Sequence, residues 1–203
     1  MRTLLLCVAL LAASLSPLSP AAAQDGPATR YVRQRQDEVM RLLRREPSGD
    51  AARTQRNDEV TRILSELLDY QELSRRALTG HWDGLTEAQR TQFVGLLRQL
   101  VERQYQRNLQ GIMDFEVRYT AEDASASGTV VHTEARSRAE RRQPPVVIDY
   151  SMHLEAGRWR VFDVNTDGVS LVRNYQRQFH NIISHDGWDA LIRRMEQRLA
   201  SGE

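Results

Sequence analysis

Residues 146–164 read VVIDYSMHLEAGRWRVFDV, and their alternation is the strongest structural signal in the chain. Apolar and polar side chains alternate from Val146 to Glu155, which is the period of a half-buried strand. Ala156-Gly157 is a turn, and residues 159–164 form the returning strand of a hairpin. This stretch therefore predicts an antiparallel sheet with one apolar face.

Two further strands are expected upstream of this hairpin, at residues 115–119 and 129–138, because the alternation recurs there. On either side the apolar spacing changes to the helical period. It predicts helices over residues 27–45, 50–69, 70–78, 86–111, 168–184 and 187–200. Thr86 and Gln89 form a capping-box pattern, and Asp50 can cap the second helix. We predict an α+β fold in which helices cover one face of a curved four-stranded antiparallel sheet.

Composition excludes several classes of protein. The chain has 203 residues, 40% hydrophobic and 27% charged, which is ordinary for a globular protein. Its single cysteine excludes an internal disulfide. All 28 basic residues are arginine, so the lysine of a Walker-type nucleotide site is missing. The 27 acidic residues balance them, which argues against nucleic acid as a partner.

The first 23 residues have the three parts of a secretory signal peptide. Arg2 supplies the positive start, residues 4–15 are apolar, and Ala21-Ala22-Ala23 offers the cleavage site. The apolar run is shorter than the roughly 20 residues of a transmembrane helix. We expect cleavage after Ala23 and a single mature domain of residues 24–203 in the periplasm. The alternatives are an uncleaved anchor and full secretion.

The search for catalytic chemistry finds one candidate. The five histidines lack short metal-ligand spacing, and no G-x-S-x-G elbow is present. Asp163 lies between Phe162 and Val164, and a desolvated carboxylate there could act as a general base. A structural hydrogen bond explains Asp163 as well, and Asp149 belongs to the polar face of its strand. The basic stretch 136–142 is either a solvated hairpin tip or a contact for phosphate headgroups or an acidic partner.

Three segments together carry a family resemblance. They are YQELSRRALTGHWDGLTEAQRTQFVGLLRQLVERQYQRNL from Tyr70, IDYSMHLEAGRWRVFDVNTDGVSLVRNYQRQFHNII from Ile148, and GWDALIRRM from Gly187. In this order they resemble the MlaC family of periplasmic phospholipid-binding proteins, also called the toluene-tolerance family. The resemblance covers about residues 39–199. The chain departs from the family at Tyr70, where an Asp-Phe pair is common, and in the arginine-rich hairpin tip.

The resemblance implies a curved sheet and helices around a deep apolar pocket, in a nuclear-transport-factor-like arrangement. Such a pocket holds phospholipid acyl chains and leaves the headgroup at its mouth. Family members shuttle this cargo between an outer-membrane lipoprotein complex and an inner-membrane ABC transporter, which maintains outer-membrane lipid asymmetry. They use no cofactor and no metal and perform no chemistry. We therefore expect a monomeric non-enzyme that touches membranes only peripherally.

The apolar faces of the long helix, the strands and the return helix supply the candidate pocket residues, although each could equally belong to a plain core. They are Leu97, Leu100, Val101, Tyr105, Phe115, Val117, Val146, Ile148, Tyr150, Met152, Trp159, Val161, Val169, Leu171, Tyr175 and Phe179. Two alternatives stay open at this point. One is an enzyme on a similar cone-shaped fold with Asp163 as base, and the other is a scaffold protein whose core is filled.

Overall fold

The computed structural model describes residues 25–201, so the predicted signal peptide lies outside the described residues. In chain order the elements are α1 (Pro27–Leu43), α2 (Asp50–Leu67), α3 (Tyr70–Ala77), the 3-10 turn η1 (Trp82–Gly84), α4 (Glu87–Ile112), β1 (Phe115–Ser125), β2 (Gly128–Ser137), β3 (Val146–Glu155), β4 (Arg158–Thr166), β5 (Val169–Ser170), α5 (Leu171–Asp186) and α6 (Trp188–Ser201). Within residues 25–201, no helix combines the length and apolarity needed to cross a membrane.

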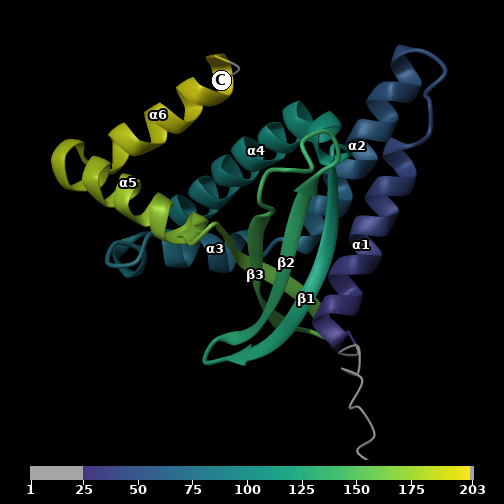
Figure 1. Cartoon of the computed structure of the whole chain (residues 1–203). Helices are drawn as coiled ribbons and strands as arrows, with labels where there is room; N and C mark the ends of the chain where they lie inside the picture. Colours follow the sequence, from purple (N-terminus) through teal and green to yellow (C-terminus); the bar gives the residue numbers. More distant parts are fainter. Residues whose placement is uncertain (1–24, 202–203) are drawn as a thin grey trace, which may run out of the picture.

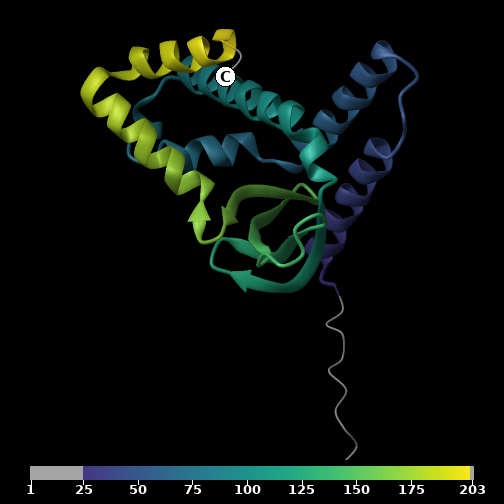
Figure 2. The same ribbon diagram turned by 45° about the horizontal axis from the view of Figure 1, so that its top comes forward.

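The strands form one curved antiparallel sheet in the order β1-β2-β3-β4-β5 (Figures 1 and 2). The predicted α+β class and the four long strands are confirmed, but the count of four is wrong. Asp167 and Gly168 both have positive φ angles, 47° and 84°, and turn the chain back so that Ser170 pairs with Asn165. A short fifth strand therefore precedes α5. Ser170 then caps that helix by accepting a hydrogen bond from the Arg173 N–H at 3.0 Å, so the helix begins at residue 171 and not at 168.

Of the two helix N-caps predicted from the sequence, the structure confirms one. Thr86 and Gln89 make the predicted capping box: Gln89 N donates to Thr86 Oγ1 at 3.2 Å, and Thr86 N donates to Gln89 Oε1 at 2.9 Å. The predicted cap at Asp50 is wrong. Gly49 is the N-cap, with a φ angle of 96°, and Asp50 lies inside the first turn, where its carboxylate pairs with Arg53 at 2.6 Å.

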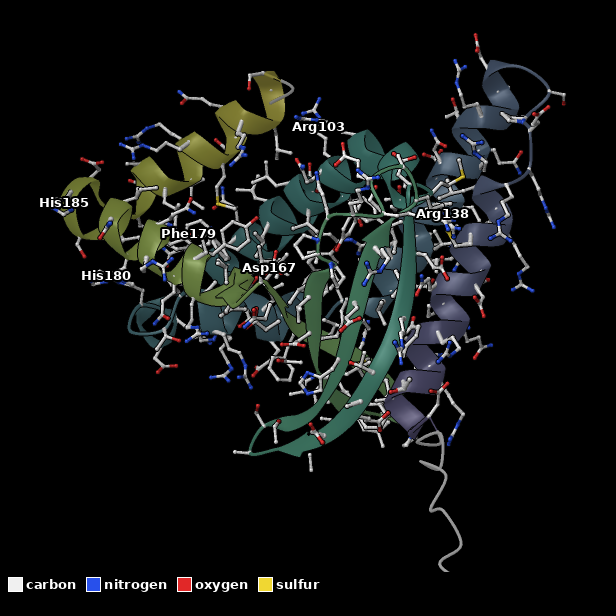
Figure 3. The ribbon with its side chains drawn as sticks, in the orientation of Figure 1. Arg103, Arg138, Asp167, Phe179, His180 and His185 are labelled. Carbon is white, nitrogen blue, oxygen red and sulfur yellow. The ribbon has the colours of Figure 1, made fainter. Side chains whose placement is uncertain are left out.

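The helices pack on the sheet as two groups. In Figure 1, α1 and α2 form an antiparallel pair at the right of the molecule, while α3, α5 and α6 lie at the left and α4 runs between the two groups. Glu122 of β1 ties the start of α1 to the sheet by accepting a hydrogen bond from the Thr29 N–H at 2.7 Å. α5 is held to α4 by Phe179, whose ring meets Phe93 edge to face at 5.4 Å (Figure 3).

The buried apolar side chains form two separate clusters. The larger one extends from α1 through α3, α4 and the sheet to α6, and Ala28 and Val32 are its members on α1. The smaller one lies between α1, α2 and the end of α4. It consists of Val39, Leu43, Val60, Ile63 and Leu109. α1 therefore contributes to both clusters.

Candidate functional site

An apolar cavity of about 390 Å³ lies between the inner face of the sheet and helices α1, α2 and α4. This volume is within the range of small-molecule sites, roughly 300–1,000 Å³. Its walls are Val32, Arg35, Gln36, Val39, Leu64, Leu67, Leu68, Tyr105, Ile112, Phe115, Val117, Ala135, Val146, Ile148, Tyr150, Val161, Val164 and Thr166. No aspartate or glutamate is among these lining residues.

The sheet side of the cavity follows from the strand period and one irregularity. Val146, Ile148 and Tyr150 alternate along β3 and face inward together. On β4, Ser151 pairs with Asp163 whereas Met152 pairs with Val161, which leaves Phe162 as an extra residue between them. This bulge lets Val161 and Val164 both face the cavity although they are three residues apart.

The structure brings seven of the predicted pocket residues to the walls of this cavity. They are Tyr105, Phe115, Val117, Val146, Ile148, Tyr150 and Val161. The other nine lie elsewhere. Leu97, Val101, Met152 and Phe179 are buried in the larger cluster, Leu100, Trp159, Leu171 and Tyr175 pack against it, and Val169 is 58% exposed. Contact of any of these side chains with a ligand remains a prediction.

Sequence reasoning missed the part of the cavity wall that α1 and α2 supply. Five of its apolar residues come from α1, α2 and the residue after α2: Val32, Val39, Leu64, Leu67 and Leu68. Their helical spacing was visible in the sequence, because the two helices have apolar faces. Periodicity identifies a face that avoids water, but it does not distinguish a face that packs from one that borders a cavity.

Few polar side chains line the cavity: Arg35, Gln36, Tyr105, Tyr150 and Thr166. Burial raises the pKa of the Tyr150 phenol, although a hydrogen bond with Thr133 opposes the shift, and burial also raises the pKa of Tyr105. Both hydroxyls therefore stay protonated at neutral pH. Arg35 pairs with Glu38 at 3.0 Å through one terminal nitrogen. Its Nε is buried and has no hydrogen-bond partner among the described residues.

Asp163, the candidate base, does not line the apolar cavity. It borders a separate polar pocket of about 580 Å³ on the other face of the sheet, together with Asp149 and His132. Its carboxylate accepts hydrogen bonds from Ser170 Oγ at 2.6 Å and from Val172 N at 3.0 Å. These two contacts hold the start of α5 against β4. They explain the presence of an aspartate at position 163 by a structural role.

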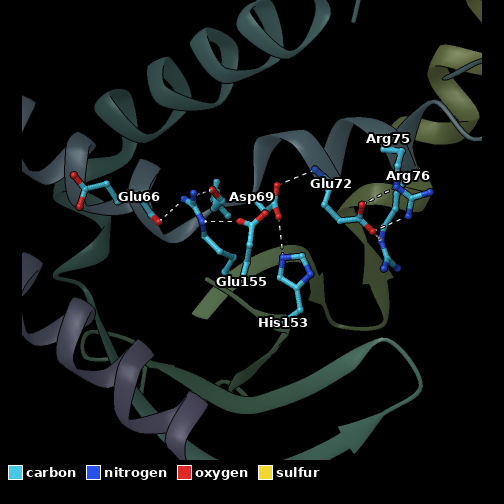
Figure 4. Close-up of polar contacts among 9 residues, drawn as sticks. Glu66, Asp69, Glu72, Arg75, Arg76, His153 and Glu155 are labelled. Carbon is cyan, nitrogen blue, oxygen red and sulfur yellow. Dashed lines mark hydrogen bonds and ion pairs between the residues drawn. The ribbon is translucent and has the colours of Figure 1, made fainter. Parts of the chain in front are cut away.

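Asp69, His153 and Glu155 are the one group among residues 25–201 that could hold a metal ion, with ligand atoms within 4.8 Å of one another (Figure 4). Each already has a partner in the protein. Asp69 binds His153 Nε2 at 2.8 Å and caps α3 through Glu72 N, also at 2.8 Å. Glu155 lies 3.5 Å from the guanidinium of Arg160. This cationic neighbour opposes a metal ion, so the group is explained as a hydrogen-bond network, with one ion pair between Glu155 and Arg160, that fixes α3 to the sheet.

Two exposed histidines, distant in sequence, are also brought together. His81 Nε2 and His180 Nδ1 lie 3.0 Å apart, joining the loop after α3 to α5. A pair of imidazoles alone falls short of the three or four protein ligands of a zinc site. It contributes a contact between two helical segments.

Known proteins resemble this chain in sequence and in fold. A phospholipid-binding protein from Ralstonia solanacearum, solved in complex with a phospholipid, superposes with a TM-score of 0.70 and 23% identity; the match covers 87% of this chain and 99% of that one. The intermembrane phospholipid transport system binding protein MlaC of Haemophilus influenzae is 20% identical over 142 residues. That match covers 68% of this chain and 66%, just under two thirds, of the relative.

The family model of the MlaC protein matches residues 33–197, which include the cavity walls from Arg35 to Thr166. That range covers most of the chain and all of its strands. The resemblance read from the three sequence segments is thereby confirmed, and the chain belongs to the MlaC family.

Proposed function

We propose that this protein is a phospholipid carrier of the bacterial periplasm, which holds acyl chains in the apolar cavity and leaves the headgroup at its opening. The observation that carries the proposal is the cavity of about 390 Å³ with its mostly aliphatic and aromatic walls. A hydrocarbon chain gains from such walls because no acidic group there requires hydration. The phospholipid complex of the Ralstonia relative supports the same cargo.

The free energy of lipid transfer explains the need for a carrier. Each methylene group exposed to water costs about 0.8 kcal/mol, so a two-chain lipid with roughly thirty methylenes carries a cost on the order of 20 kcal/mol. A free lipid almost never crosses an aqueous gap against this penalty. A protein that encloses the chains removes much of the cost and needs no ATP of its own.

The direction of transport must come from a difference in affinity for the lipid at the two membranes. We propose that the carrier exchanges lipid with an outer-membrane lipoprotein complex and with an inner-membrane ABC transporter, and so maintains outer-membrane lipid asymmetry. The description of the Haemophilus relative as part of an intermembrane transport system supports this role. In this proposal the protein works as a monomer, is exported by its signal peptide and begins at Gln24. The mass of the intact periplasmic protein tests the cleavage.

We also propose that the protein acts as a carrier and not as an enzyme. The support is the position of its carboxylates. Asp163 caps a helix on the other face of the sheet, and the residues lining the apolar cavity include no acidic side chain. A hydrophobic substrate in the cavity would therefore meet no general base of this type.

The proposal is tested on protein purified from the periplasm without detergent. Solvent extraction and mass spectrometry should find phospholipid in stoichiometric amount. The delipidated protein should also take phospholipid from vesicles. Protein that is free of lipid as isolated and fails to take it from vesicles would refute the proposal.

A further inference from the structure

A stripe of arginines borders the apolar cavity on α1. Positions 30, 33, 41 and 44 are arginines and position 37 is an aspartate; the five positions recur every three or four residues and therefore share one side of the helix. Together with the start of β1 this stripe encloses a groove of about 730 Å³. Five arginines line it against two carboxylates, Asp37 and Glu116. The arginines are Arg30, Arg33, Arg41 and Arg44 from α1 and its C-cap, and Arg138 from the loop after β2. Figure 3 labels Arg138.

The groove and the apolar cavity share a wall. Gln36, Phe115 and Val117 line both of them. Phe115 is 37% exposed although it belongs to the cavity, so this wall lies where the cavity opens to solvent. Acyl chains inserted from this side would leave the phosphate of their headgroup beside the groove.

Part of the positive charge in the groove is not neutralised. Arg33 is held by Asp25 through two hydrogen bonds of 2.8 and 3.0 Å, and Arg138 lies 3.9 Å from Glu116. In contrast, no hydrogen bond or ion pair within residues 25–201 engages the guanidinium of Arg41 or Arg44. Guanidinium groups bind phosphate oxygens in pairs of parallel hydrogen bonds. Two such groups are therefore available beside the opening.

We propose that this arginine groove binds the headgroup phosphate of the carried lipid and selects headgroups with a net negative charge. A zwitterionic ethanolamine headgroup brings an ammonium group into the same positive field, which opposes its binding, whereas a glycerol headgroup does not. The inference rests on the proposed carrier function and adds a headgroup preference to it. The attraction is that of exposed charges, so it weakens as salt screens them.

The test is competition between two lipids with identical acyl chains. Delipidated full-length protein is incubated with vesicles of equal parts phosphatidylglycerol and phosphatidylethanolamine, reisolated, and analysed by mass spectrometry. The wild type should be enriched in phosphatidylglycerol by about threefold or more, as expected for two exposed charge contacts. The double variant Arg41→Gln/Arg44→Gln should lose the enrichment and keep the total lipid. Arg177→Gln/Arg193→Gln, on α5 and α6, removes the same charge elsewhere and should keep the enrichment.

A second measurement needs no variant. The enrichment by the wild type should fall as sodium chloride is raised from about 0.05 M to about 0.5 M, because the screening length shrinks severalfold. An enrichment that is absent, or that persists unchanged in high salt, overturns the headgroup assignment.

The remaining outcomes separate the inference from the proposed function. A wild type that takes no lipid overturns both. Equal enrichment in the arginine variant and its control overturns the inference alone. Slower uptake of both lipids at an unchanged ratio would mean that the groove meets the vesicle surface and not the bound headgroup. Inorganic phosphate that binds lipid-loaded and lipid-free protein equally, at constant ionic strength, would show a free-phosphate site and also overturn it.

Discussion

Filling the apolar cavity from its wall should abolish lipid uptake and leave the fold intact. Ala135 is only 5% exposed and its side chain lines the cavity from β2. In Ala135→Phe, a phenyl ring would enter this space and exclude about five methylenes of cargo. At about 0.8 kcal/mol each, the loss is about 4 kcal/mol, or roughly a thousandfold in affinity. Lipid recovered from vesicles by the delipidated variant should fall below detection.

The matched control is Ala77→Phe. Ala77 is 1% exposed and packs within the larger cluster, away from the cavity. The same ring there overpacks a filled core, which costs about 1–3 kcal/mol. In urea unfolding of delipidated protein, Ala135→Phe should match the wild type or exceed it, while Ala77→Phe should be less stable. An Ala135→Phe protein that is destabilised as much as the control and still binds lipid would refute the assignment of this cavity as the lipid-binding site.

Three further predictions concern stability. Asp163→Asn should lower the free energy of unfolding by about 1–2 kcal/mol, because the carboxylate caps α5, and should keep lipid uptake; loss of lipid uptake in a folded variant would contradict its structural role. Hydrogen bonding from Arg75 is the main cause that lowers the pKa of Glu72 to about 2. The stability that ionised Glu72 contributes to the folded protein is therefore complete above about pH 4.5 and is lost as the pH falls through 2. Urea unfolding of the wild type and Glu72→Gln should differ by about 1 kcal/mol at pH 7, since Arg75 is half exposed, and converge near pH 2; a constant difference would rule this out. Phe93→Ala, which removes a fully buried ring that contacts Phe179, should cost about 3–5 kcal/mol in the same assay, and a loss below 1 kcal/mol would mean that α5 packs differently.

The long strands and most helices were predictable because their signals are local. Alternation along residues 146–155 indicates directly which side chains are buried. The capping box at Thr86 is a contact between residues that are three positions apart in the sequence. The fifth strand was not predictable in this way. It depends on a turn at Asp167, where a non-glycine residue takes a positive φ angle to bring Val169 and Ser170 back onto β4.

The cavity was harder to predict because its position depends on distant packing. The strand residues Ile148 and Tyr150 could be named, since a sheet has two distinct faces. Phe179 and Val32 could not be told apart, because both lie on apolar helix faces. Only the arrangement of the helices places Phe179 against Phe93 and Val32 beside the cavity. The bulge at Phe162, which aims Val164 inward, is likewise a property of strand pairing.

The separation of the apolar interior into two clusters has a consequence for dynamics. The cavity lies between Val32 in one cluster and Val39 in the other, so α1 passes over it. Across the cavity, the α1–α2 pair gains few dispersion contacts with the rest of the interior, and its local opening should require less free energy than global unfolding. Cargo that fills the space joins the two clusters into one cooperative unit and slows amide hydrogen exchange in this pair first. Lipid loading would then rigidify α1 and α2, and under the proposed carrier function this change would distinguish loaded from empty protein at the surface.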